Sequence, residues 1–232
     1  MSQSLQIGTI TPGAAVGLQL HRLLRDRIIR GDLGPGTRIS ETEVALGYGV
    51  SRQPVREAFI KLAEESLVEV RPQRGTYVQR ISIPAVKTAR FVREAVEADI
   101  CRLAAERADA EGIAALDALI TRQRVGVVTS DPAVFIQLDE EFHRMLASLA
   151  GQAAVWDILE SLKTQMDRVR YISTRQLPRE RLIEQHAAIV EAVRHNDASA
   201  AEAAIRRHLN EIVADLMSIA AAMPEAFDLE ES

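Results

Sequence analysis

Apolar residues recur every three to four positions in the first part of the chain, which is the period of an amphipathic helix. In a first helix, expected over about residues 16–30, the positions on one face are Leu20, Leu24 and Ile28. A capping box, in which Glu43 follows Ser40 by three residues, predicts the start of a second helix. Ser51 is the expected cap of a third helix, whose apolar positions are Val55, Phe59 and Leu62.

The pattern changes to the β type after the third helix. Two short β-prone runs, Val68–Val70 and Thr76–Val78, flank the turn sequence Pro72–Gly75. The second and third helices are joined by a tight, glycine-containing turn, as a helix-turn-helix requires. Three helices followed by a hairpin predict a winged helix-turn-helix domain over residues 12–80.

From Ser82 onward the periodicity is helical throughout. The predicted helices cover approximately residues 82–108, 111–127, 131–151, 153–173, 178–195 and 198–223. Because the connections are short, neighbouring helices are expected to be antiparallel. The predicted fold class is therefore mainly α, with an N-terminal winged helix-turn-helix followed by an antiparallel α-helical bundle over residues 82–223. The acidic tail from Pro224 is expected to fray.

Composition limits the class of protein. The 232 residues are enough for two modest domains, and 47% hydrophobic and 26% charged residues are ordinary for a soluble globular chain. The single cysteine, Cys101, excludes a disulfide framework and fits a reducing compartment. No segment has the length and apolarity of a membrane span, and Met1–Ile10 lacks the pattern of a signal peptide. We therefore expect a cytoplasmic protein without a membrane partner.

The net charge of −5 hides a difference between the two predicted domains. Residues 1–80 carry 11 Lys and Arg against 8 Asp and Glu, whereas residues 81–232 carry 17 against 25. A basic domain joined to an acidic one is expected where one domain contacts phosphates. Recognition helices contact base edges mainly with their N-terminal residues, and Arg and Gln form paired hydrogen bonds with guanine and adenine. The residues expected to contact DNA are Arg52, Gln53 and Arg56 of the third helix and Arg74 and Gly75 at the hairpin tip.

Four residues of metal-ligating types are expected on inward faces of the bundle. Asp139 and His143 are one helical turn apart and share a face with apolar residues, and His186 and His208 fall on apolar stripes of two other predicted helices. Burying an unpaired charge is costly, and a divalent cation would offset that cost. However, a single histidine on an apolar stripe is more often a core residue with an ordinary hydrogen bond, and Asp139 with His143 also fits a buried ion pair. From the residues alone, a metal site and a satisfied polar core both remain open.

Four motifs stand out in the N-terminal domain: Gly34-Pro35-Gly36, Ser40-Glu41-Thr42-Glu43-Val44-Ala45, Val50-Ser51-Arg52-Gln53-Pro54-Val55-Arg56-Glu57-Ala58 and Arg71-Pro72-Gln73-Arg74-Gly75. They resemble motifs of the GntR-type bacterial transcription regulators. The third of these is highly specific. The helical remainder is similar to the effector-binding (FCD) domain of the FadR-like subgroup, so the resemblance spans nearly the whole chain. Members often have Asn where this chain has Gln152 after Gly151, and Gly where it has Ser66.

The resemblance implies a metal centre with a ligand beside it. In metal-binding members of the subgroup an Asp-x-x-x-His pair and two later histidines hold a divalent metal, and here the matching residues are Asp139, His143, His186 and His208. Three histidines and a carboxylate favour Zn²⁺, with Ni²⁺ and Mn²⁺ as alternatives. Relatives also have an arginine that helps to hold a small carboxylate effector, with a nearby glutamate, and these are matched by Arg93 and Glu97.

Together these expectations describe a cytoplasmic, homodimeric, metal-dependent transcription regulator. It would be a repressor that binds double-stranded operator DNA, and residues 82–223 would bind a small organic acid and form the dimer. One alternative is a metal-dependent hydrolase, because the same four ligands could activate water, although that function leaves the N-terminal domain unexplained. The other is an acyl-coenzyme A-responsive regulator without metal, a type that lacks the metal ligands. The identities of the effector and of the operator are not predicted.

Overall fold

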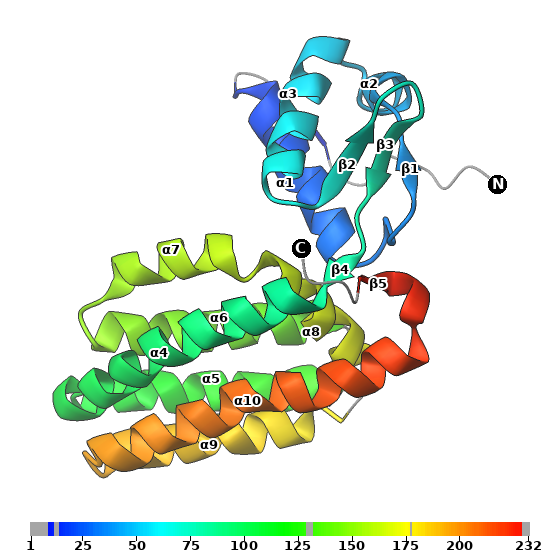
Figure 1. The fold of residues 1–232 in the computed structure, drawn as a ribbon. Coiled ribbons are helices and arrows are strands. Elements are labelled where there is room, and N and C mark those ends of the chain that lie inside the picture. The colour runs from blue at the N-terminus through cyan, green and yellow to red at the C-terminus, as the bar shows by residue number, and fades with distance from the viewer. Residues whose placement is uncertain (1–8, 12–13, 129–131, 177, 229–232) are drawn as a thin grey trace. The chain divides into compact units, whose positions relative to one another are not determined.

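The computed structural model describes residues 9–11, 14–128, 132–176 and 178–228, and within them the chain forms two compact units (Figure 1). The first unit extends to Ser82 and includes Met223–Asp228, and the second comprises Ile83–Ala222. The first is a winged helix-turn-helix and the second is an all-helical bundle, which confirms the predicted fold class.

The N-terminal unit combines three helices with a small sheet. Its helices are α1 (Val16–Ile29), α2 (Glu41–Tyr48) and α3 (Arg52–Glu64), and its antiparallel strands are β1 (Arg38–Ile39), β2 (Val68–Arg71) and β3 (Gly75–Val78). The strand order is β1-β3-β2. Strand β1 was not predicted, because two residues carry no periodic signal and the strand exists only through its pairing with β3. The apolar faces of α1 and α3 pack into one core that includes Leu24, Phe59 and Leu62.

Local sequence determines how α2 begins and ends. The hydroxyl of Ser40 accepts a hydrogen bond from the backbone N–H of Glu43 at 3.5 Å, as the capping box predicted. Gly49 then ends the helix in the left-handed conformation, with φ 65°. Glycine adopts that conformation without a steric penalty, so the chain turns at once into α3.

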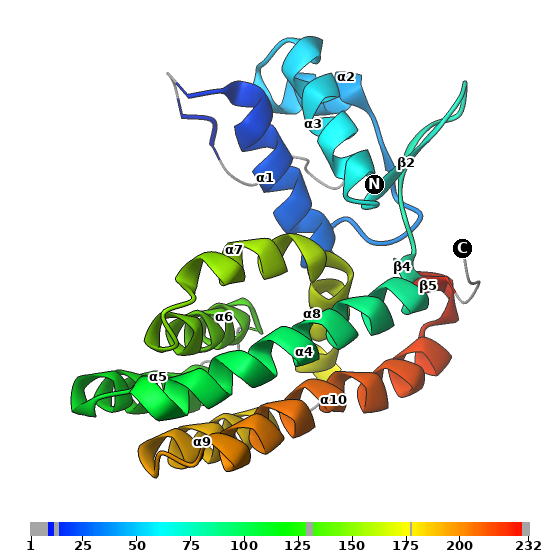
Figure 2. The same cartoon turned by 60° about the vertical axis from the view of Figure 1, so that its left-hand side comes forward.

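The C-terminal unit consists, among its described residues, of seven helices. They are α4 (Ile83–Arg107), α5 (Ala110–Val128), α6 (Pro132–Leu149), α7 (Ala153–Leu162), α8 (Thr164–Gln176), α9 (Glu180–Arg194) and α10 (Ala198–Ala222). The two longest, α4 and α10, lie side by side and antiparallel, and α9 packs along α10 (Figures 1 and 2). Helix α6 packs against α4 and α5, and α8 contacts α4, α6 and α10. None of the helices in the described ranges has the length and apolarity needed to cross a membrane.

The single helix predicted over residues 153–173 is wrong, because the chain breaks into α7 and α8 at Lys163. The buried ammonium group of Lys163 lies 2.7 Å from Glu140 Oε1 and 2.8 Å from Asp167 Oδ2. Glu140 belongs to α6, so one of these contacts is tertiary. The periodicity of the segment holds no signal for such a contact, and neither proline nor glycine marks the break.

The prediction that the tail frays from Pro224 is also wrong for its described residues. A short 3₁₀ helix, η1 (Pro224–Ala226), leads into β5 (Phe227–Asp228), which pairs in parallel with β4 (Ile81–Ser82). The side chain of Phe227 is buried, and the burial of an aromatic ring offsets the entropy lost on ordering a few residues. Residues 229–232 lie outside the described part of the chain.

Candidate functional site

Four donor groups from three helices face one another inside the C-terminal bundle. Asp139 and His143 lie on α6, His186 on α9 and His208 on α10, and all four are buried. One ligand atom from each residue lies within 4.8 Å of the others. The Nε2 atom of His186 is 3.3 Å from His208 Nε2 and 3.5 Å from Asp139 Oδ1, and His143 Nε2 is 3.6 Å from Asp139 Oδ2.

Two of the histidines are held by amides at their other ring nitrogen. His186 Nδ1 lies 2.9 Å from Gln123 Oε1, and His208 Nδ1 lies 2.9 Å from Gln185 Oε1. The amide of Gln123 donates its N–H to a backbone carbonyl, and that of Gln185 donates to a carboxylate, so both amide oxygens face the rings. An amide oxygen can only accept, and each ring therefore carries its proton on Nδ1 and a lone pair on Nε2.

The third histidine is held by a carboxylate. His143 Nδ1 lies 2.8 Å from Glu97 Oε2, while Glu97 Oε1 accepts a hydrogen bond from Arg93 Nε at 2.5 Å. Burial alone would raise the pKa of Glu97, but Arg93 and His143 outweigh burial and lower it to about 2. Both oxygens of Glu97 are thus engaged within the protein. Its position is that of a residue that orients His143.

The chemistry of this donor set fits a divalent cation. Neither Oδ1 of Asp139 nor Nε2 of His143 has a hydrogen-bond partner among the described residues. Burial lowers the pKa of His186 to about 3 and that of His208 well below its ordinary value, although Asp139 opposes both shifts. Neutral imidazoles and an ionised carboxylate are the forms in which these residues bind metals. A cation would also relieve the unfavourable approach of two Nε2 lone pairs at 3.3 Å.

Arg170 of α8 belongs to the site and was not predicted. Its Nη2 forms an ion pair with Asp139 Oδ2, and its Nη1 lies 3.0 Å from Glu140 Oε1. Burial would raise the pKa of Asp139, but Arg170 and the three histidine rings hold it well below its ordinary value. Helix α8 carries polar residues on most of its faces, a composition typical of an exposed helix. Sequence periodicity therefore gave no reason to place Arg170 inside the bundle.

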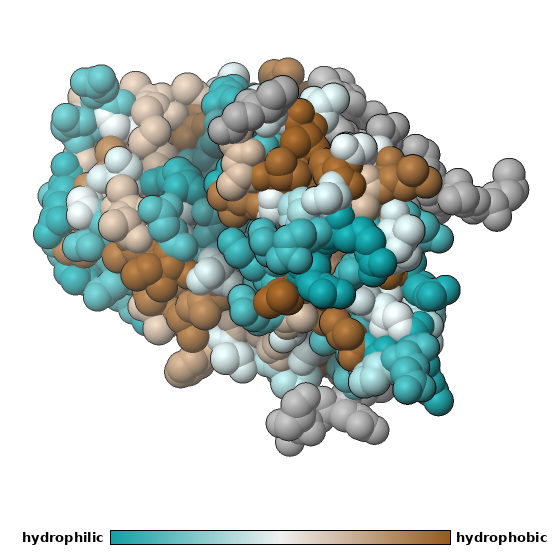
Figure 3. All heavy atoms as spheres, turned by 90° about the horizontal axis from the view of Figure 1, so that it is seen from above, coloured by the Kyte–Doolittle hydropathy of each residue, from teal (hydrophilic) through white to brown (hydrophobic). Residues whose placement is uncertain are grey.

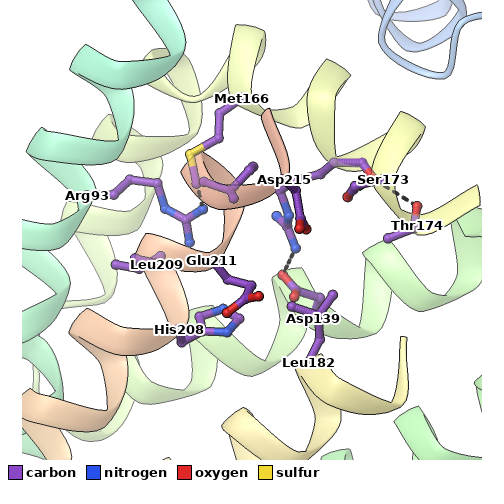
Figure 4. Close-up of a pocket in the computed structure, with 12 residues that line it drawn as sticks. Arg93, Asp139, Met166, Ser173, Thr174, Leu182, His208, Leu209, Glu211 and Asp215 are labelled. Carbon is purple, nitrogen blue, oxygen red and sulfur yellow. Dashed lines mark hydrogen bonds and ion pairs between the residues drawn. The ribbon is translucent and has the colours of Figure 1, made fainter. Parts of the chain in front are cut away.

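A cavity opens beside the four donor groups (Figure 4). It encloses about 430 Å³ of empty space, part of it open to solvent, and its lining includes Arg93, Asp139, His208, Glu211 and Asp215. Figure 4 shows the guanidinium of Arg93 and the carboxylates of Glu211 and Asp215 turned toward the same space. A second cavity, of about 560 Å³, shares Glu211 and Asp215 and is bordered by residues just before and in the first turn of α9. A small molecule could therefore reach the donor groups through the second cavity, past Glu211 and Asp215.

The predicted DNA contacts of α3 lie exposed in the N-terminal unit. The side chains of Arg52 and Arg56 are 62% and 61% exposed, and Gln53 is exposed beside them. Figure 3 shows hydrophilic side chains gathered across this unit, with separate apolar patches next to them. Glu41 of α2, which sequence reasoning missed, pairs with both arginines, at 3.0 Å from Arg52 Nη2 and 3.4 Å from Arg56 Nε.

The hairpin tip places the other two predicted contacts together. Arg74 is exposed, and its carbonyl accepts a hydrogen bond from the Tyr77 hydroxyl at 3.1 Å. Gly75 has φ 107°, and a Cβ atom at this position would lie 2.9 Å from Arg38 Nε. The backbone there requires glycine. The close approach also brings Arg38 of β1 to the hairpin, a second arginine that the sequence did not identify.

Comparisons with known proteins agree with this architecture. Residues 17–78 match the model of the bacterial regulatory proteins of the gntR family, and residues 89–211 match that of the FCD domain. The HTH-type transcriptional repressor RspR of Escherichia coli K12 is 41% identical over 204 residues, covering 88% of this chain and 90% of RspR. The HTH-type transcriptional repressor NanR of Salmonella arizonae is 30% identical over 213 residues, covering 82% of this chain and 80% of NanR. The solved structure of E. coli McbR/YncC has a TM-score of 0.74, covers 89% of this chain and 99% of its own, and at 19% identity supports the fold alone.

Proposed function

The chain belongs to the GntR family of bacterial transcription regulators and carries an FCD domain, and from that premise we propose that it is a metal-dependent repressor that responds to a small organic acid. DNA-binding transcription regulation is the function of the family, and the relatives named above are transcription regulators and not enzymes. The observation that supports the metal and the organic acid is the convergence of three histidine Nε2 atoms and a carboxylate beside a cavity.

A divalent metal would be held by Asp139, His143, His186 and His208. Borderline ions suit this donor set, so we propose Zn²⁺, with Ni²⁺ and Mn²⁺ as competitors. When bound, such an ion supplies a Lewis-acidic centre that attracts an anionic oxygen of the effector. An amide or carboxylate group contacts the Nδ1 atom of each of the three histidines, and partners of this kind fix the ring orientation and raise metal affinity.

Arg93 is the proposed anchor of the effector. Its side chain is buried, lines the cavity, and has an Nη2 without a hydrogen-bond partner among the described residues. A buried donor without a partner costs about 1–3 kcal/mol, and a ligand carboxylate would recover that free energy. Glu97, which was expected to contact the effector, we now propose as the residue that positions both Arg93 and His143.

The proposed DNA contacts are Arg52, Gln53, Arg56, Arg74 and Gly75. Residues 12–80 would bind one operator half-site, and residues 82–223 would bind the effector and form a homodimer. A two-fold symmetric dimer matches two half-sites about one helical turn apart. The effector would change DNA affinity only by the difference between its affinities for the DNA-competent and DNA-incompetent dimers.

Elemental analysis of protein purified without chelators tests the metal site. We expect about one divalent transition metal per chain, lost in His186→Ala and retained in the control His195→Ala, whose side chain is 69% exposed. The chain's single tryptophan, Trp156, stacks on His143 with ring centroids 5.6 Å apart, so its fluorescence should report metal removal and return. If the wild-type protein contains metal only at background level, the proposed site is refuted.

Arg93→Ala tests the link between effector and DNA. It should keep metal and operator DNA but lose the release of DNA that a small carboxylate causes in the wild type, for which typical coupling predicts a change of about 5- to 150-fold in operator affinity. The control Arg102→Ala removes an exposed arginine from the same helix and should respond normally. A normal response of Arg93→Ala would show that the anchor lies elsewhere.

Titration with operator DNA tests the recognition helix. Arg52→Ala and Arg56→Ala should each weaken specific binding by about 1–3 kcal/mol while metal content stays unchanged. The control is Arg144→Ala, which removes an exposed arginine from α6. If both α3 variants bind the operator as tightly as the wild type, α3 does not contact the bases.

A further inference from the structure

We propose that the effector is a zwitterion, whose carboxylate binds at Arg93 and whose ammonium group binds at Asp215 and Glu211 on α10. This inference rests on the proposed function and narrows the class of ligand. It follows from two opposite charge imbalances on the walls of one cavity, which Figure 4 shows with Arg93 and Asp215 on opposite sides of the space.

The positive wall is the buried fork of Arg93. Its Nε is used by Glu97, whereas its Nη1 has only the thioether sulfur of Met166, at 3.7 Å, as an acceptor. Its Nη2 has no hydrogen-bond partner among the described residues. A thioether is a weak acceptor, so two N–H groups of a planar guanidinium remain open to a carboxylate.

The negative wall is one face of α10. His208, Glu211 and Asp215 follow one another at helical spacings of three and four residues, so all three turn toward the cavity that they line. Glu211 is compensated, because its Oε1 lies 2.6 Å from Arg181 Nη2 and its Oε2 accepts a hydrogen bond from Gln185. Asp215, in contrast, forms neither a hydrogen bond nor an ion pair with any residue that the structure describes.

The electrostatic environment of Asp215 is that of a carboxylate lacking a cation. Burial raises its pKa, the neighbouring Glu211 raises it further, and Arg181 only partly opposes them. A ligand with carboxylates alone would bring more negative charge to this wall. A ligand with an ammonium group would supply the missing counter-charge and donate hydrogen bonds to both carboxylates.

Calorimetric titration of the metal-loaded protein tests this inference. The probes are the twenty common L-amino acids, β-alanine and 4-aminobutyrate, each beside the acid of the same carbon skeleton without its α-, β- or γ-amino group. At least one amino acid should bind, about 10-fold or more tightly than its deaminated counterpart, and should release operator DNA. Asp215→Asn should abolish that preference by weakening the amino acid alone, with metal content unchanged. The control Asp99→Asn, on an exposed part of α4, should keep the preference.

Three other outcomes would overturn the inference, and they separate it from the proposed function. If deaminated acids bind as tightly as amino acids and release DNA, the ligand is a plain organic acid, and the proposed function stands. If the amine preference survives Asp215→Asn, the ammonium group binds elsewhere. If no compound of either kind binds the metal-loaded protein, the zwitterion is overturned, and the proposed function depends on its own tests of metal content and of Arg93→Ala.

Discussion

The two units of the chain handle charge in opposite ways. In the N-terminal unit, Arg52 and Arg56 are 62% and 61% exposed and share one carboxylate. In the C-terminal unit, Arg170 and its partner Asp139 are 10% and 1% exposed. An exposed ion pair contributes about 0–1 kcal/mol, whereas removing one partner of a buried pair costs about 3–5 kcal/mol. Burial, more than the presence of charge, distinguishes the two regions.

This difference suits each unit to a different ligand. The exposed arginines can exchange their carboxylate for DNA phosphates or bases at little cost, and such contacts weaken with salt. The buried groups cannot rearrange cheaply, so they hold a fixed set of donor atoms, which is the arrangement that the proposed cation needs. The exposed arginines are suited to reversible exchange of partners, and the buried groups are suited to a fixed geometry.

The largest expected effect on stability comes from removing Arg170, the buried arginine of α8. Arg170→Ala leaves Asp139 without its cationic partner and leaves Glu140 with Lys163 alone, and it should lower the free energy of unfolding of the metal-free protein by about 3–5 kcal/mol. Added Zn²⁺ should recover part of the loss, because the metal compensates Asp139. Urea unfolding followed by Trp156 fluorescence measures both values, since Trp156 lies in the C-terminal unit.

Arg52→Ala provides the matched exposed substitution. Its free energy of unfolding, followed by the loss of helical circular dichroism because Trp156 lies in the other unit, should stay within about 0.5 kcal/mol of the wild type. If Arg170→Ala and Arg52→Ala change the free energy of unfolding equally, the contrast between the units is removed. That result would show that Arg170 is solvated in solution.

The next effect is on pH dependence. An unfolded histidine binds a proton below about pH 6.5, but burial lowers the pKa of His186 in the folded protein to about 3. The unfolded state therefore binds more protons in this range, and the free energy of unfolding of the metal-free protein should fall as pH decreases. The loss should approach about 1.4 kcal/mol for each pH unit and each such histidine. Urea unfolding at pH 7 and pH 5.5, with Trp156 fluorescence, measures it.

An exposed histidine again gives the control. His195, at the end of α9, is 69% exposed, so His195→Gln should leave the pH dependence unchanged. A free energy of unfolding that is constant between pH 7 and pH 5.5 would contradict the burial of neutral histidines in the metal-free protein.

Sequence reasoning identified the four clustered donor residues but not the residues that hold them in place. Asp139 and His143 lie one turn apart on an apolar helix face, a local pattern that survives folding. Gln123, Gln185 and Arg170 act through contacts with residues on other helices, so no local spacing identifies them. The same limit explains the missed break at Lys163, whose partner Glu140 lies on α6.

Backbone conformation followed the same division. The capping box at Ser40 and the glycine turn at Gly49 depend on neighbouring residues and were predicted. Strands β1 and β5 exist only through pairing with distant strands and were not. Ser66 has φ 55°, a left-handed conformation, at a position where relatives often have glycine. The departure from the family pattern at Ser66 is therefore accommodated by the backbone without a change of fold.

The smallest expected effect concerns Glu41, which neutralises the two recognition arginines in the free protein. Its pKa lies below the ordinary value because Arg52 and Arg56 outweigh burial, so it is ionised at neutral pH. Non-specific affinity comes almost entirely from phosphate electrostatics. Removing the competing carboxylate in Glu41→Gln should therefore tighten binding to random DNA by up to about 1 kcal/mol. Operator affinity should change less, because Glu41 also orients the arginines, and the ratio of specific to non-specific affinity should fall.

The control Glu43→Gln removes the same charge from the same helix, where Glu43 is exposed and its side chain contacts neither arginine. Parallel titrations of operator and random DNA decide the point: equal shifts in both variants would mean that overall charge, and not pairing with Arg52 and Arg56, sets the effect.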